Sequence, residues 1–481
     1  MIVNNSDYVI IMTEFEETIN KLESEKILDK ALKLGASYVD LRYQLYNNEE
    51  IRVENKSLED YKSRNFGGLG IRVVINNAVG FASTSNLAKE NIDKTLQNAI
   101  KLAKSFESVR GKFAEKEVVE KKEIVATKIN PNDVSPEEKV KLLLETNKAA
   151  FINDEIKNVI TVMGSGIDNR FFIASDGSQI RLQVPTVGLA QIVTAVSNGN
   201  METVVNREGA CAGYEKIQHD DWNHFSKDLS ELAIRSAKAS TPPAGTYPVI
   251  VDPRLVGILT HEAFGHAAEA DLVFTGSSTL KDRLGEQLAS NLVTIIDEGV
   301  VKGGYHLPFD DEGTPKGKTV ILENGVLKGY IHDRNTADVL AVSPTGNSRA
   351  QDFENQPIVR MTNTYIEAGD HTFEELIEGI DHGVYIKNKG SGGGQVETGM
   401  GTFTFNGGES FMIEKGELAE PVRGVIISGA ILDTLKTVDG VGKDKEIITG
   451  HFGACGKGNQ AARVGFGGPH IRVREMTIGG R

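Results

Sequence analysis

Two histidines and a glutamate stand close together in residues 261–266, which read HEAFGH. Imidazole nitrogens are common zinc ligands, and a catalytic zinc site needs about three protein ligands and an open position for water. A nearby carboxylate can take the proton of that water as it attacks a carbonyl. His261, Glu262 and His266 therefore predict two metal ligands and a general base on one helix.

The spacing of the two histidines is one residue longer than in the usual helical zinc motif. At 100° per residue, five steps turn the second side chain roughly 140° away from the first in a regular α-helix. A single π-type turn would absorb the extra residue and return both rings to one face. Gly265 has the backbone freedom for such a distortion. We therefore expect a π-turn between His261 and His266.

The third ligand stays open among four candidates. Glu269 follows His266 by three residues, a position that also suits a carboxylate orienting the imidazole. Cys455 lies in the glycine-rich run 453–458, where Lys457 favours a thiolate that zinc would bind. A lone cysteine is about as often a small buried hydrophobic residue. The other two candidates are His451 and His470.

The elements that carry these residues can be read from caps and turns. Residues 247–251 predict a strand, and Asp252 and Pro253 then predict the N-cap and first position of the histidine-bearing helix. The run 241–245, TPPAG, marks a domain boundary. We predict an N-terminal α+β half over 1–240, with a division into 1–125 and 126–240 as an alternative. A C-terminal metal-binding peptidase domain follows over 241–481.

The N-terminal half alternates helical and strand patterns. Apolar periodicity predicts helices over 14–34, 87–103 and 229–239, and Ser135 predicts the N-cap of another. Strand segments are expected at 38–46, 51–53, 58–63, 70–75, 78–82, 171–174 and 180–184. Asn76-Asn77, Asp176-Gly177 and Asn324-Gly325 predict hairpin turns. After residue 291 the pattern is one of strands and turns. The fold class is therefore α+β: a helix-plus-strand-meander N-terminal half and a largely antiparallel β C-terminal domain carrying the metal-binding helix.

Composition excludes several classes of function. The chain has 67 acidic and 53 basic residues and a net charge of −14, without a long basic run, which argues against nucleic-acid binding. Two cysteines in 481 residues argue against a disulfide-stapled secreted protein. The apolar runs are too short for a spanning helix or a signal peptide. We expect a cytoplasmic protein without a membrane partner.

Several short runs together resemble the TldD/PmbA family of peptidases, and in particular its metal-binding TldD branch. The matching runs are 65–73 (NFGGLGIRV), 261–266 (HEAFGH), 309–314 (FDDEGT), 360–364 (RMTNT), 392–396 (GGGQV) and 453–457 (GACGK). The resemblance implies one zinc ion (Zn2+) per chain, held by His261, His266 and Cys455, with Glu262 as general base. It also implies unfolded or short peptides as substrates. A dimer is implied as well, either a homodimer or a heterodimer with a motif-lacking PmbA/TldE-like paralogue.

Other runs have both a structural and a functional interpretation. Asp310 and Asp311 are typical of a turn. The glycine-rich run that contains Gly393, Gly394 and Gln395 is expected to expose backbone groups that pair with an extended peptide. Asn363 is a further candidate for substrate binding.

Two other functions are alternatives to a TldD-like peptidase. A peptidase like dipeptidyl peptidase III shares the longer histidine spacing but takes its third ligand from a glutamate on a following helix. A non-catalytic peptide-binding partner subunit is the alternative from a different class, and the intact Glu262 argues against it.

Overall fold

The N-terminal half is built around one long sheet. The computed structural model describes residues 6–106, 112–397 and 399–480. The sheet has the strand order β3-β2-β1-β5-β6-β4, and β7 pairs with β6. Its strands are β1 (Tyr38–Glu54), β2 (Ser57–Ile75), β3 (Ala78–Thr84), β4 (Glu120–Ile124), β5 (Ile156–Ala174), β6 (Gln179–Ser197) and β7 (Asn200–Ala210). Strands from both sides of residue 125 therefore share a single sheet.

These strands are longer than the sequence pattern predicted. The segments expected at 38–46 and 51–53 form the single strand β1, and those at 58–63 and 70–75 form β2. The polar run Asn47–Glu50 continues β1 because β2 and β5 pair with it on both sides. Its side chains find polar partners there, as Asn47 does with Asn65 at 2.8 Å. The strand β1 thus continues through a polar run that the sequence pattern read as a break.

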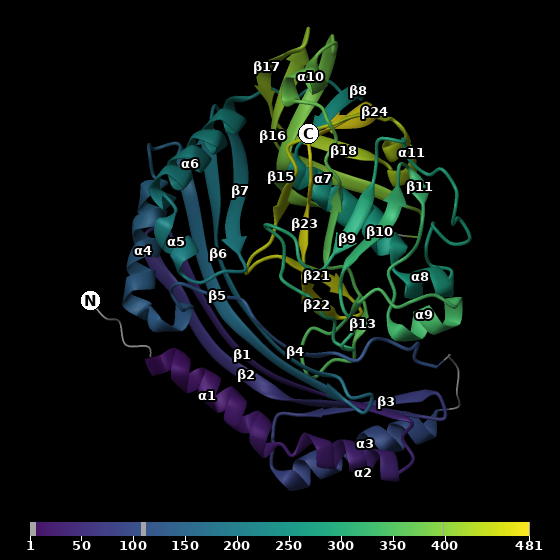
Figure 1. The fold of residues 1–481 in the computed structure, drawn as a ribbon. Coiled ribbons are helices and arrows are strands. Elements are labelled where there is room, and N and C mark those ends of the chain that lie inside the picture. Colours follow the sequence, from purple (N-terminus) through teal and green to yellow (C-terminus); the bar gives the residue numbers. More distant parts are fainter. Residues whose placement is uncertain (1–5, 107–111, 398, 481) are drawn as a thin grey trace.

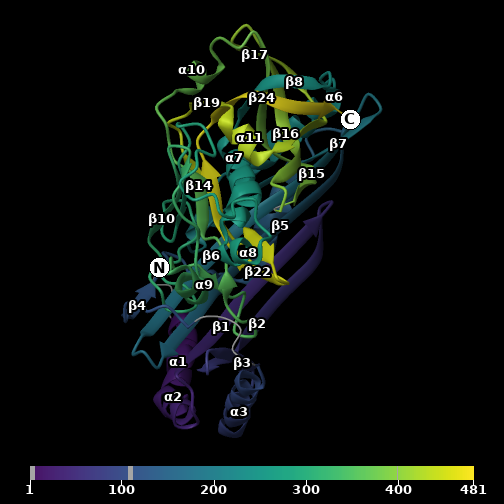
Figure 2. The ribbon, with the colours of Figure 1, turned by 90° about the vertical axis from the view of Figure 1, so that its right-hand side faces the viewer.

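Helices cover the convex side of this sheet, and the C-terminal half lies on its concave side (Figures 1 and 2). The predicted helix 14–34 is two helices, because Glu23 between them has a left-handed φ of 47°. The helices of this half are α1 (Ser6–Lys21), α2 (Ser24–Lys33), α3 (Lys89–Ser105), α4 (Pro136–Ala149), α5 (Glu215–His219) and α6 (Trp222–Lys238). Their apolar faces pack on β1, β2, β5 and β6 in three buried clusters.

The predicted turns and caps of this half are present. Asn76 and Asn77 both have positive φ values, 51° and 63°, in the hairpin between β2 and β3. Gly177, with a φ of 93°, lies in the turn between β5 and β6. The Ser135 hydroxyl accepts a hydrogen bond of 3.2 Å from the Glu138 amide at the start of α4.

The C-terminal half contains two larger sheets with orders β11-β10-β9-β14-β23-β20 and β15-β8-β24-β18-β16-β17. Most pairs are antiparallel, and the parallel pairs are β14–β23 and β15–β8. The strands of the first sheet are β9 (Ile295–Glu298), β10 (Lys318–Glu323), β11 (Val326–Leu327), β14 (Asn363–Ile366), β20 (Glu446–Ile448) and β23 (Gly465–Gly468). Those of the second are β8 (Gly245–Val251), β15 (His382–Glu397), β16 (Thr402–Glu414), β17 (Glu417–Val422), β18 (Val425–Ala430) and β24 (Ile471–Gly480), with β19 (Val438–Val441) beside β24.

Smaller elements complete this half. The prediction of only strands and turns after residue 291 was wrong in part, since three short helices occur there: α9 (Arg334–Leu340), α10 (Phe373–Ile377) and α11 (Ile431–Lys436). Each is five to seven residues long, too short to leave a clear helical period in the sequence. The two-stranded ladders are β12 (Ser348–Arg349) with β13 (Ile358–Val359), and β21 (Ala454–Lys457) with β22 (Gln460–Arg463).

One helix between the two sheets leads to the histidines. After β8, the Asp252 side chain accepts a hydrogen bond of 2.8 Å from the Leu255 amide, and α7 (Pro253–Leu259) begins at Pro253, as predicted. A Cβ at Gly257 would lie 2.3 Å from the backbone nitrogen of Gly467 in β23, so α7 packs directly on the sheet backbone. Two neighbouring sheets thus fix α7 along its length.

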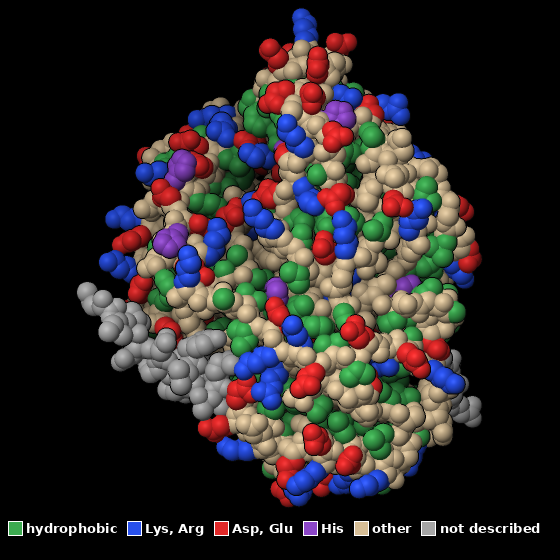
Figure 3. All heavy atoms as spheres, viewed as in Figure 1, with side chains coloured by type: hydrophobic (Ala, Val, Ile, Leu, Met, Phe, Trp, Pro, Cys, Tyr) green, Lys and Arg blue, Asp and Glu red, His purple; other side chains and the backbone are tan. Residues whose placement is uncertain are grey.

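No helix among the described residues is long and apolar enough to cross a membrane. Basic and acidic side chains are interspersed over the face shown in Figure 3, without the continuous basic patch that a nucleic acid would need. The domain boundary at 241–245 stays a prediction, and the chain passes there from α6 to β8.

Candidate metal centre

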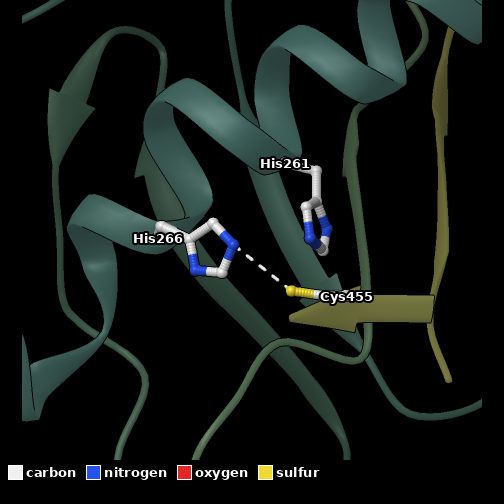
Figure 4. Close-up of side chains that lie close together, drawn as sticks. All are labelled: His261, His266 and Cys455. Carbon is white, nitrogen blue, oxygen red and sulfur yellow. Dashed lines mark hydrogen bonds between the residues drawn. The ribbon is translucent and has the colours of Figure 1, made fainter. Parts of the chain in front are cut away.

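The helix carrying the two histidines changes its winding between them. α7 continues without a break into a π-helical turn, Thr260–Gly265, and then into a 3-10 turn, His266–Ala268. The rings of His261 and His266 face a common space, with their centroids 5.3 Å apart (Figure 4). The expected π-turn is confirmed.

The reason for the glycine in this turn differs from the expectation. Gly265 has φ −60° and ψ −46°, ordinary helical values that any residue adopts. A Cβ at this position would lie only 2.1 Å from the sulfur of Met361, which is completely buried. Gly265 is therefore required by close packing against Met361 and not by backbone freedom.

Cys455 completes the cluster from a different part of the chain. It lies on β21, and its sulfur is 3.2 Å from Nε2 of His266 (Figure 4). One ligand atom from each of His261, His266 and Cys455 lies within 4.8 Å of the others, and all three residues are buried. The structure thus brings together the three residues that the resemblance named.

The arrangement fits a zinc ion in chemistry and in size. Two imidazoles and one thiolate are ligands that zinc prefers, and three protein ligands leave one position open for water. With metal–ligand distances of about 2.0–2.3 Å, tetrahedral donor atoms lie roughly 3.3–3.7 Å apart. Sγ of Cys455 and Nε2 of His266 are 3.2 Å apart, and the three ligand atoms all lie within 4.8 Å of one another. Nδ1 of His261 is buried and has no hydrogen-bond partner among the described residues.

The electrostatics of the cluster favour the ligating form of the cysteine. Burial by itself would raise the pKa of Cys455, but His261 and His266 outweigh it and lower that pKa to about 5. Burial lowers the pKa of His266, whereas Glu269 and Cys455 raise it, to about 10. The two histidines therefore favour the thiolate of Cys455, the form that binds metals. Lys457, which we expected to favour the thiolate, is not among the largest causes of this shift.

Two glutamates flank His266 in different ways. The side chain of Glu262 is 42% exposed, and its Oε2 lies 3.8 Å from Nε2 of His266. Glu269 is completely buried, and its Oε2 accepts a hydrogen bond of 3.0 Å from Nδ1 of His266. This bond turns Nε2 of His266 toward Cys455, as expected of a carboxylate that orients a metal-ligating imidazole.

The remaining two candidates for the third ligand take part in other contacts. Nδ1 of His451 lies 3.3 Å from the hydroxyl of Thr186 in β6, and its ring packs against Gly164 in β5. His470 pairs with Asp444, and its Nε2 is 3.0 Å from the hydroxyl of Tyr385. Neither histidine belongs to the cluster.

A cavity of about 340 Å3 opens beside the cluster. Its walls include Glu262 and His266 on one side and Gly394, Val396 and Phe405 on the other. A larger cavity of about 620 Å3 lies between α6–β7 and β15–β16, and the two cavities share Lys389. The cluster is thus reachable from the surface on the side where Glu262 is exposed.

Lys389 lines both cavities, and it was not among the residues singled out from the sequence. Its ammonium lies 5.7 Å from the centre of the Phe405 ring and makes no ion pair with the described residues. Burial and Arg207 lower the pKa of Lys389, while the charge of Glu262 raises it. Only its position beside a glycine-rich run could have pointed to it, and such a position is common for exposed lysines.

The glycine-rich strand borders this cavity with an unpaired edge. In the β15–β16 ladder the register breaks between Lys389 and Gly394. Beyond the break, Gly394 to Glu397 pair with β16 on one edge, and no strand of the described chain pairs with their other edge. Gly393 has a φ of 78°, and Gln395 is exposed. A free strand edge therefore lies next to the cluster.

Three family models match the chain: PmbA/TldA metallopeptidase domain 1 over residues 39–103, the central domain over 129–241 and the C-terminal domain over 244–480. The chain belongs to the PmbA/TldA metallopeptidase family. All three domains of this family follow one another here in order.

Several curated relatives of this chain are named for proteolysis. A metalloprotease of Methanocaldococcus jannaschii is 39% identical over 94% of this chain and 99% of its own length. A metalloprotease of Methanothermobacter thermautotrophicus is 38% identical over 92% and 95%. A zinc metalloprotease TldD homolog of Saccharolobus solfataricus is 31% identical over 95% and 99%.

Solved structures share the fold at lower identity. A protein of Thermotoga maritima described as a modulator of a DNA gyrase is 24% identical, with a TM-score of 0.78 over 97% of this chain and 100% of its own. TldE from Thermococcus kodakarensis is 19% identical, with a TM-score of 0.75 over 95% and 100%. The α+β fold predicted from the sequence is thus that of PmbA/TldA relatives.

The run 360–364 has a structural role. Arg360 donates a hydrogen bond to the carbonyl of Cys455, and Met361 packs on Gly265. Asn363 is completely buried; it donates to the carbonyls of Glu298 and Tyr305 and accepts from the Tyr305 amide. The amide of Asn363, a candidate for substrate binding from the sequence, is thus used in hydrogen bonds inside the protein.

The run 309–314 joins the two halves of the chain. Glu312 and Asp40 both accept hydrogen bonds from Arg72, at 2.7 and 2.8 Å, and all three side chains are buried. Asp311 pairs with Arg170 of β5 at 2.9 Å. Breaking a buried pair of this kind strongly destabilises a protein. This run therefore fixes the long sheet against the half that carries the cluster.

Proposed function

We propose that this chain is a zinc-dependent peptidase whose metal ligands are His261, His266 and Cys455. The observation that carries the proposal is the convergence of these three buried side chains within 4.8 Å, next to an exposed glutamate. A bound zinc ion would polarise a peptide carbonyl and lower the pKa of a bound water.

Glu262 is proposed as the general base. Its carboxylate lies on the wall of the cavity, 3.8 Å from Nε2 of His266, and its exposure lets it reach a water in the open position. Glu262 takes a proton from the attacking water and passes it to the leaving amine. Glu269 keeps the His266 ring in the orientation that this arrangement needs.

The substrate class proposed is short or unfolded peptides. Residues Gly394 to Glu397 offer a free strand edge, and an extended peptide can add to such an edge through backbone hydrogen bonds. Gly394 presents no side chain to the cavity, so a peptide backbone can approach it closely. Backbone pairing of this kind gives little side-chain selectivity. A folded domain cannot present an extended backbone to the site.

We also propose a dimer, in which the chain pairs either with itself or with a motif-lacking relative. The solved fold named TldE supports the second arrangement. The role of non-catalytic partner is disfavoured for this chain, because it keeps both histidines, the cysteine and Glu262. Light scattering of the chain alone and after co-expression with such a relative would decide between the two dimers.

The test compares a flexible peptide with a tightly folded domain as substrates of the zinc-loaded protein. We expect cleavage of the peptide at several bonds and survival of the domain, read by mass spectrometry. The matched control is Glu262→Gln, which should keep its zinc while losing about 10²–10⁴-fold in rate. Undiminished cleavage by Glu262→Gln would place the base elsewhere. Cleavage of the folded domain with the peptide left intact would refute the substrate class.

A further inference from the structure

The ammonium of Lys457 is held by four acceptors near the cluster. Nζ lies 2.8 Å from each carboxylate oxygen of Asp271, 2.8 Å from the carbonyl of Val359 and 3.1 Å from Oε2 of Glu269. An ammonium has three N–H donors, and three residues therefore occupy all of them. Although Lys457 borders the cavity, it has no donor left for a substrate.

These contacts join segments that are distant in the sequence. Lys457 and Cys455 lie on the same short strand, β21. Glu269 and Asp271 lie just after His266, at the start of α8 (Ala270–Thr275), and Val359 belongs to β13. Lys457 is therefore the link from the strand that carries the thiolate to the segment that carries the imidazole.

The link reaches the imidazole through Glu269. Oε2 of Glu269 receives both the His266 hydrogen bond and the Lys457 contact, while its Oε1 is buried and has no hydrogen-bond partner in the described part of the chain. Glu269 is completely buried, and its carboxylate contacts two cationic or basic side chains, His266 and Lys457. Without Lys457, a completely buried carboxylate would keep only His266 as a cationic partner.

We propose that Lys457 is a positioning residue, which holds β21 against Glu269 and Asp271 and thereby sets the placement of Cys455 relative to His266. This inference rests on the proposed zinc-peptidase function. It assigns Lys457 no contact with the substrate. Its consequence is a donor set that is already arranged before a metal ion binds, which is how residues behind metal ligands usually raise affinity.

The experiment measures the zinc dissociation constant by competition with a chromogenic chelator. Lys457→Met should raise this constant about 10–100-fold, the usual effect of losing a residue behind the ligands. The matched control is Lys445→Met, which removes a half-buried lysine paired with Glu367 in the same half of the chain, away from the cluster. A constant for Lys457→Met within twofold of both wild type and this control would overturn the proposal.

Two further variants separate position from charge. Lys457→Arg keeps the charge but not the compact three-donor head, so we expect an affinity between those of wild type and Lys457→Met. Full recovery in Lys457→Arg would show that charge alone suffices and would overturn the positioning role. If Lys457→Met does not fold, Asp271→Ala decides, because it removes one anchor of the same ammonium; a loss of at least threefold is expected, and unchanged affinity refutes the proposal.

A spectroscopic measurement reports on the geometry directly. In cobalt-substituted protein, the thiolate-to-cobalt absorption band should be weaker or shifted in Lys457→Met and unchanged in Lys445→Met; an unchanged band in Lys457→Met argues against the proposal. Wild-type protein that binds no zinc would refute the proposed function itself. Wild-type protein that binds zinc and cleaves peptides, beside a Lys457→Met variant of equal affinity, would refute the role of Lys457 alone.

Discussion

Replacing Gly265 by alanine tests how the π-turn is held in place. The new methyl group would meet the sulfur of Met361 at 2.1 Å, its terminal carbon at 3.3 Å and the carbonyl of Thr260 at 3.4 Å. The first distance is far inside van der Waals contact, so Met361 or the helix must move. Because Arg360, the neighbour of Met361, holds the carbonyl of Cys455, this movement is transmitted to the cluster.

Two opposing effects set the change in the free energy of unfolding of Gly265→Ala. Alanine favours a helix over glycine by about 1 kcal/mol, whereas overpacking a buried site costs about 1–3 kcal/mol. At such a short distance we expect the overpacking to dominate, with a net loss of about 1 kcal/mol in the free energy of unfolding. If about 1.4 kcal/mol of strain falls on the metal-bound form, zinc affinity drops about tenfold.

The assay combines urea-induced unfolding with the zinc dissociation constant. Gly329→Ala is the control, because nothing lies within 4 Å of a Cβ at that position. The second variant, Gly265→Ala with Met361→Val, removes the offending sulfur and should recover part of the lost affinity. A Gly265→Ala protein that is more stable than wild type and binds zinc equally well would refute the packing argument. If adding Met361→Val recovers none of the lost zinc affinity, the glycine is needed for its backbone freedom and not for packing against Met361.

Two other changes probe the ligand set and its spacing. Cys455→Ser should lose most of its zinc while keeping its circular dichroism spectrum, because a hydroxyl is a poor zinc ligand; wild-type zinc content would return the third ligand to Glu269. Deleting Ala263 restores the four-residue histidine spacing but shortens the turn Thr260–Gly265, so zinc binding should be lost. Full affinity in the deletion variant would contradict the need for a π-turn.

Local chemistry made part of the fold predictable. Caps and turns could be read from a few residues because they act on nearby backbone. Asp252 and Ser135 accept hydrogen bonds from backbone amides through their side chains. The pairs Asn76-Asn77 and Asp176-Gly177 allow the positive φ values of their turns. The π-turn could be predicted for the same reason, since it follows from the spacing of two side chains that must share a face.

Tertiary pairing explains what could not be predicted. The polar run Asn47–Glu50 lies inside a strand because two neighbouring strands pair with it. The residues of the run itself carry no strand pattern that would have predicted this. Asn363 resembles a binding residue in isolation, but its partners Glu298 and Tyr305 lie about 60 residues away along the chain. The position of Lys389 on the cavity wall follows from the tertiary structure and not from its sequence neighbours.

The cluster depends on residues that never touch a metal. His261 and His266 share one helix, but Cys455 reaches them from nearly 200 residues later, and only contacts between other residues can fix that approach. Arg360 holds the backbone of Cys455, and Lys457 holds its strand to Glu269. A short strand fixed at both its backbone and a nearby side chain has little freedom to shift its thiolate. Weakening either contact should therefore reduce metal affinity well before the fold is lost.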